Sequence, residues 1–202
     1  MQWCLSWQRW LRGLIKQPPL DWWVGVNKTP VCRLFIVIAL IVSVQAINLV
    51  IDVNTMIAAY LMLGAGGVGL GVAFVLGKCT LPSVAVMLII VSGILAVASL
   101  MVLSIALSND LVFRIRGQAF SFILWVQCPA MFGFPLLPTA VIISCIVGLD
   151  AAASLRSQAL HGDPFEPRTV ASAAVLGLGC FGATCMQMGR LRSIYDVQRE
   201  LS

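Results

Sequence analysis

Residues 55–77 form an unbroken apolar stretch that contains six glycines. As a helix, the stretch is long enough to cross a bilayer core of about 30 Å. In water, each glycine inside a helix would cost about 1 kcal/mol relative to alanine, so such a helix would be weak. In a membrane, the backbone has no water to bond, so the helix persists and its glycines become a surface for close packing. The stretch therefore predicts a helix that spans a membrane.

Small residues lie on two opposite sides of this predicted helix. One side carries Gly64, Gly67 and Gly71, and the other carries Ala59, Gly66, Ala73 and Gly77. Small side chains let the backbones of two helices approach closely, so each side suits a neighbouring helix. Two such sides predict that residues 55–77 lie at the centre of a helix bundle.

Composition supports the same class of fold. The 202 residues are 60% hydrophobic and 10% charged, whereas soluble proteins are about 25% charged. We expect an all-α integral membrane protein, with a bundle of about six transmembrane helices after an N-terminal amphipathic interfacial helix. Residues 1–30 form the N-terminal segment, 31–189 the single bundle and 190–202 a C-terminal tail. The predicted spans are 34–51, 55–77, 82–108, 118–133, 136–155 and 169–188.

The apolar run 119–155 allows two span counts. Its 37 residues would make a helix about 55 Å long, which is too long for one crossing. Pro129, Gly133, Pro135 and Pro138 interrupt the run near its middle. The run therefore predicts two short spans, and the alternative is five spans in all, with a re-entrant or surface segment near residues 129–138.

The distribution of positive charge favours six spans over five. With six spans, both termini lie on one side of the membrane, together with nine of the thirteen Lys and Arg residues. These nine are Arg9, Arg12, Lys16, Lys28, Arg33, Lys78, Arg190, Arg192 and Arg199. The other four are Arg114, Arg116, Arg156 and Arg168. Five spans would give a split of eight to five, and cytoplasmic segments usually carry the excess of Lys and Arg.

Small residues also recur at intervals of seven in the predicted span 82–108. They are Ala85, Ser92, Ser99 and Ala106. A stripe with this period is typical of left-handed helix packing. It predicts that this span packs against the side of residues 55–77 that carries Ala59, Gly66 and Ala73.

Tryptophans near the N-terminus predict anchors at the membrane interface. Trp3, Trp7 and Trp10 fall on one side of a helix whose other side is largely basic or polar. An amphipathic helix of this kind lies in the headgroup layer of a membrane. Trp22 and Trp23 follow it, and we expect them to add a second interfacial contact.

Four polar residues in or beside the predicted spans form a candidate site. Gln45, Asn48 and Asp52 share one side of the first span, and Gln127 interrupts a later one. Buried ionisable groups are costly in a membrane, so such a polar seam is typical of a relay or an ion-contacting site. The alternative is that Gln45 and Asn48 bond to neighbouring helices while Asp52 helps to form a tight turn at the interface.

The seven cysteines show no metal-binding spacing and do not indicate a disulfide framework. Four of them lie within predicted spans, where cysteine acts as a small apolar residue. Cys4, Cys32 and Cys79 lie at expected membrane boundaries and are candidates for acylation. We predict no metal site.

The sequence contains none of the common catalytic or nucleotide-binding motifs. Its positive charges flank apolar runs instead of forming a basic block, so nucleic acid is not an expected partner. We therefore expect a protein without catalytic chemistry or a cofactor, in contact with membrane lipids and other transmembrane subunits. The leading hypothesis is a structural or accessory subunit of a larger membrane protein complex. The alternative is a small-solute or ion transporter or channel that uses the polar seam.

A membrane enzyme is a third hypothesis, limited by the shortage of titratable groups that converge on one place. The seven cysteines and a weak targeting signal favour a eukaryotic endomembrane or the inner membrane of an organelle.

Overall fold

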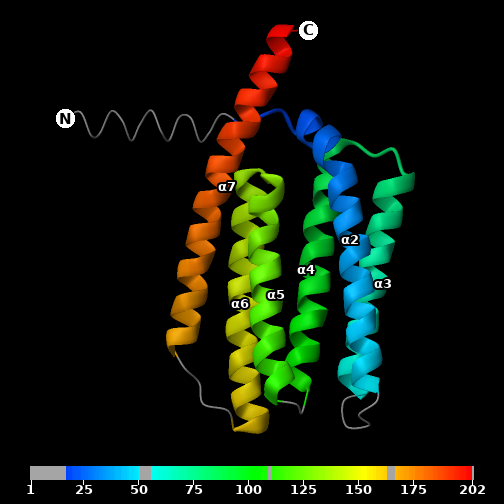
Figure 1. The fold of residues 1–202 in the computed structure, drawn as a ribbon, viewed down its shortest axis with the longest axis vertical. Coiled ribbons are helices and arrows are strands. Elements are labelled where there is room, and N and C mark those ends of the chain that lie inside the picture. Colours follow the sequence, from blue (N-terminus) through cyan, green and yellow to red (C-terminus); the bar gives the residue numbers. More distant parts are fainter. Residues whose placement is uncertain (1–16, 51–55, 109–110, 163–166, 202) are drawn as a thin grey trace, which may run out of the picture.

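The computed structural model describes residues 17–50, 56–108, 111–162 and 167–201, and within these ranges the chain forms helices and no strand (Figure 1). The six helices are α2 (Leu20–Val50), α3 (Met56–Lys78), α4 (Ser83–Leu107), α5 (Leu111–Phe132), α6 (Leu136–His161) and α7 (Pro167–Leu201). Four of them, α2, α3, α4 and α6, are long and apolar enough to cross a membrane. The prediction of an all-α chain with helices suited to a membrane is therefore confirmed at this level.

Several helices extend beyond the apolar runs that predicted them. Helix α2 begins at Leu20 and continues through Pro30, and helix α5 begins at Leu111. Helix α7 continues through the predicted tail to Leu201. No proline interrupts that tail, and an Arg192–Asp196 ion pair one turn apart supports its helical form. Hydropathy marks the part of a helix that suits lipid, while the helix itself ends where a breaker or a cap occurs.

Helices α5 and α6 are separated by a short break at residues 133–135. Gly133 has a φ of 55°, a left-handed conformation that glycine adopts without steric cost. The amide of Phe134 donates a hydrogen bond to the carbonyl of Pro129 at 3.0 Å, and Pro135 precedes the first residue of α6. The glycine and the prolines thus divide the long apolar run into two helices.

Helix α4, not α3, occupies the centre of the bundle. It packs against α2, α3, α5 and α6, whereas α3 lies at one edge and packs mainly on α2 and α4 (Figure 1). The prediction that residues 55–77 form the centre is therefore wrong. Glycine-rich helices pack closely, but the centre also has to be filled, and α4 supplies larger side chains for that purpose.

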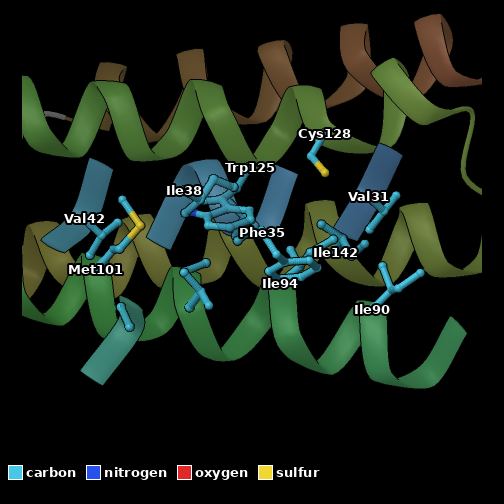
Figure 2. Close-up of a cluster of buried hydrophobic side chains, with 14 of the residues drawn as sticks. Val31, Phe35, Ile38, Val42, Ile90, Ile94, Met101, Trp125, Cys128 and Ile142 are labelled. Carbon is cyan, nitrogen blue, oxygen red and sulfur yellow. The ribbon is translucent and has the colours of Figure 1, made fainter. Parts of the chain in front are cut away.

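The core consists of apolar side chains that converge on α4 from its neighbours. Figure 2 shows Ile94 of α4 next to Phe35 of α2, and Met101 of α4 next to Val42 of α2. Side chains from α5 and α6 complete this part of the core: Trp125, Cys128 and Ile142. Branched and aromatic side chains in contact with one another give the bundle its dense interior.

Candidate functional site

One small-residue side of α3 packs tightly against α2. A Cβ atom added at Gly66 would lie 2.9 Å from Ser43 Oγ and 3.4 Å from the Ala39 carbonyl oxygen. On the same side, the Cys32 thiol donates a hydrogen bond to the Ala73 carbonyl at 3.2 Å. Ala59 is also buried. The side that carries Ala59, Gly66 and Ala73 is therefore a close helix interface, as its residues predict, but its partner is α2.

The predicted pairing of this side with the seven-residue stripe of α4 is consequently wrong. Ser92 is exposed and Ser99 is half-buried, and each hydroxyl donates to a carbonyl of its own helix. Ala106 is buried in a small cluster with Ala153 of α6. Ala85 is half-buried. The four residues of the stripe thus do not share one partner helix, because α4 has neighbours on several sides.

Helix α4 instead meets α3 through residues that the stripe does not include. A Cβ atom at Gly93 would lie 2.8 Å from Val72 Cγ2 and 3.2 Å from Phe35 Cζ, so Gly93 marks the place where α2, α3 and α4 converge. Nearer the other end of α4, the buried Ser104 hydroxyl donates to the Ala58 carbonyl at 2.7 Å. In the sequence, the isolated Gly93 inside the predicted span 82–108 was the feature that could have indicated this junction.

The other small-residue side of α3 has no neighbouring helix among the described residues. Gly64, Gly67 and Gly71, here called the outer glycine face, are all exposed. A Cβ atom at Gly67 or Gly71 would meet no atom within 4 Å, and one at Gly64 would only touch Leu100 at 3.9 Å. Tyr60 and Phe74, each 66% exposed, also point away from the bundle. Gly77, predicted for the inner side, is exposed as well, although it lies near Cys32.

Helix α7, at the opposite edge of the bundle, has a similar surface (Figure 1). Gly179 and Gly182 are exposed, and a Cβ atom at either would meet nothing within 4 Å. Leu178 and Met186 beside them are also exposed. By contrast, a Cβ atom added at Gly177 would lie 3.0 Å from Ile143 Cγ2 of α6. Both edge helices therefore use some glycines for packing inside the bundle and present others outward.

The predicted polar seam does not line the interior. Gln45 and Asn48 are exposed on α2, and Gln127 is exposed on α5. Asp52 lies outside the described residues. The structure therefore does not bring the described members of the seam together, and it does not place them at a helix interface.

A different polar cluster lies between α5 and α6. Gln118 Nε2 donates to Asp150 Oδ1 at 2.9 Å and to Ser154 Oγ at 2.8 Å. The Ser154 hydroxyl donates to the Asp150 carbonyl oxygen at 3.0 Å. The sequence showed Asp150 only as an interruption of an apolar run, and nothing in the sequence indicated that Gln118 faces it. This contact depends on how α5 and α6 are aligned along their lengths, and local sequence patterns do not contain that information.

The tryptophans at the start of α2 have different roles. Trp23 has no exposed surface, and its indole Nε1–H donates to the Gly133 carbonyl at 2.6 Å and to the Phe132 carbonyl at 3.1 Å. The prediction of an interfacial anchor is therefore wrong for Trp23, because the α5–α6 break offers carbonyls for its N–H and the Phe134 ring for its indole. Trp22 is half-buried.

Trp22 joins the start of α2 to the end of α7. Its Nε1–H donates to Gln198 Oε1 at 3.0 Å, and its ring lies edge-on to Tyr195 at 5.6 Å. This contact places the beginning of α2 and the end of α7 at the same end of the bundle (Figure 1). The other predicted anchors, Trp3, Trp7 and Trp10, lie outside the described residues.

The predicted acylation sites differ in accessibility. Cys79 is exposed, and its carbonyl accepts a hydrogen bond from Lys28 Nζ at 3.2 Å. Cys32 is half-buried, with its thiol bonded to α3. Cys4 lies outside the described residues. Of the two described candidates, Cys79 offers the more accessible thiol, and acylation stays a prediction.

The chain matches no family model, no curated protein and no solved structure. In the four described ranges, no three His, Cys, Asp or Glu side chains lie close enough together to hold a metal ion. Functional inference therefore depends on the surfaces and contacts of this chain itself.

Proposed function

We propose that this protein is a non-enzymatic subunit of a larger membrane assembly and that it docks a further transmembrane helix on the outer glycine face of α3. The observation that supports this proposal is the exposure of Gly64, Gly67 and Gly71 in the middle of an apolar helix. The helix already uses its opposite side to pack on α2. The outer side has the same small-residue character and no partner among the described helices.

The physical argument is a comparison between lipid and protein as neighbours of glycine. Lipid tails are as apolar as leucine, so contact between glycine and lipid gives little stabilisation. A second helix can approach glycine closely and gain van der Waals contact. Exposed Tyr60 and Phe74 stand on either side of the glycines along the helix and offer larger surfaces for the same partner. A docked helix would therefore contact both a row of small residues and the larger side chains at its two ends.

In this proposal the chain crosses the membrane six times, with the start of α2 and the end of α7 on the same side. Successive helices alternate in direction (Figure 1). Lys78, Arg190 and Arg192 lie toward the end of the bundle where α7 ends, and Arg114 and Arg156 lie toward the other end. Among the described residues, the larger share of Lys and Arg thus falls on the side where α2 begins and α7 ends, which we assign to the cytoplasmic or equivalent side.

The proposal can be tested by replacing glycines of the outer face. In the variant Gly67→Leu/Gly71→Leu, leucine side chains would hold a docked helix away, so the protein should lose its partner while keeping its fold. The measurement is native mass spectrometry after gentle solubilisation, with helical content from circular dichroism. The matched control is Gly25→Leu, which alters an exposed helical glycine of α2 with open space around it. A wild-type protein that is only a monomer, with no accompanying chain, would contradict the proposal.

A further inference from the structure

Asp150 is the one buried carboxylate among the described residues, with 5% of its surface exposed. It lies in the second half of α6, a helix apolar enough to cross a membrane, and Gln118 of α5 and Ser154 of α6 surround it. We propose that Asp150, Gln118 and Ser154 form a proton-binding site inside the membrane part of the bundle. This proposal is independent of the docking function of α3.

Among the described residues, no charged side chain pairs with an ionised Asp150. Its side chain contacts the neutral amide of Gln118 and forms no ion pair with any described residue. A carboxylate that is removed from water without a countercharge is strongly unfavourable, and protonation removes the charge. Ionisable groups inside membrane helices are rare, and they commonly mark ion or proton sites.

The charged groups on every helix around Asp150 are few. Helix α4 has no ionisable side chain between Ser83 and Leu107, and its Val102 and Ala106 form an apolar cluster with Ala153, which lies close to Asp150 in α6. On α5, Arg114 is buried and donates from Nη1 to the Ser108 carbonyl at 2.8 Å. Among the residues that the structure describes, the other charged or titratable groups toward this end of the bundle are Arg116 of α5 and Arg156 and His161 of α6; Arg168 lies in α7, and its side chain is not described.

The neighbours of Asp150 can satisfy both of its protonation states. Toward a carboxylate, Gln118 donates from Nε2, as observed. Toward a protonated carboxyl, a rotation of the Gln118 amide by half a turn presents Oε1, which accepts the new O–H. Ser154 both donates and accepts, so it fits either arrangement. Both protonation states can therefore be hydrogen-bonded without a change in the positions of α5 and α6.

The same cluster is a poor fit for a metal ion. Hard cations such as Ca²⁺ take about six to eight oxygen ligands, whereas three side chains supply the oxygens of this cluster. The described residues offer no additional acidic or histidine ligand near Asp150. A single proton needs only the Asp150 oxygen and one acceptor, and Asp150 Oδ2 accepts no hydrogen bond from a described residue. The chemistry of the cluster therefore selects a proton.

The test is infrared spectroscopy of the full chain in lipid nanodiscs at a pH of about 7, where an exposed aspartate, with a pKa of about 3.9, is ionised. We expect the wild-type protein to show the C=O stretching band of a protonated carboxyl. The variant Asp150→Asn should lose this band. The control Asp196→Asn, which changes a half-exposed carboxylate paired with Arg192, should keep it.

A second variant keeps the proposal testable if Asp150→Asn does not fold. In Gln118→Leu, the carboxyl remains but loses its amide partner, so the band should move to higher frequency because the carboxyl no longer donates its O–H to Gln118 Oε1. A wild-type spectrum without a protonated-carboxyl band at this pH would overturn the proposal and leave the cluster as a structural contact between α5 and α6. A band that Gln118→Leu does not move would place the protonated group elsewhere and would also overturn it. Assembly measured on the same samples should not change with Asp150→Asn, so the two proposals fail separately.

Discussion

Helices α3 and α4 pack against each other but differ in glycine content and in their place in the bundle. Helix α3 contains six glycines and lies at the edge of the bundle, whereas α4 contains one glycine and lies at its centre. The centre needs side chains large enough to fill the space between several helices, and Ile90, Ile94 and Val97 of α4 are all buried. Glycine content therefore indicates where a backbone can approach another backbone, and it does not indicate the centre of a membrane bundle.

The two sides of α3 extend this comparison within one helix. The inner side, with Gly66 and Ala73, is closed by α2, and the outer side, with Gly67 and Gly71, is open. Both sides carry small residues, so the two sides differ in whether a neighbouring helix covers them. Because no described helix covers the outer side, we propose that its partner is another chain or a second copy of this one.

The largest expected effect comes from Gly66→Leu compared with Gly67→Leu, two adjacent positions on opposite sides of α3. At Gly66 even a Cβ atom would lie 2.9 Å from Ser43 Oγ, so leucine should destabilise the fold by about 3 kcal/mol through overpacking. At Gly67 leucine enters open space and should leave the free energy of unfolding unchanged within about 0.5 kcal/mol. Unfolding in detergent, followed by tryptophan fluorescence, measures both. Equal destabilisation would show that the two sides of α3 do not differ as described.

A smaller effect is expected from Ile94→Ala in α4, with Leu70→Ala in α3 as its control. Ile94 is buried at the centre, and Leu70 is 49% exposed at the edge. The cavity at Ile94 should cost about 2 kcal/mol, at the low end for buried isoleucine, because lipid is itself apolar and the transfer term is small. Leu70→Ala should change stability by less than about 0.5 kcal/mol. If the Leu70 variant were the less stable one, α4 would not be the helix that the core depends on.

Much of the helical framework was predictable from the sequence. Residues 55–77 predicted α3, observed as Met56–Lys78, and residues 82–108 predicted α4, observed as Ser83–Leu107. The break near Gly133 was also predictable, because glycine and proline act locally. These features depend on the chain within a few residues of where they occur.

Contacts between distant segments were not predictable from local patterns. Trp23 is buried because the Gly133 carbonyl, far along the chain, accepts its N–H. Asp150 and Gln118 meet because of the register between α5 and α6. The choice of partner for each side of α3 could not be predicted either, since both sides carry small residues at spacings that fit a helix.

The central claim is that the outer glycine face of α3 contacts protein, while other exposed surfaces contact lipid. A photo-reactive amino acid placed at Leu70, beside this face, tests the claim in native membranes, with the same residue at Leu40 of α2 as the matched site. Both leucines are exposed apolar positions in helices suited to a membrane. We predict cross-links from position 70 to a protein chain and cross-links from position 40 mainly to lipid. Lipid adducts alone at both positions would contradict the account.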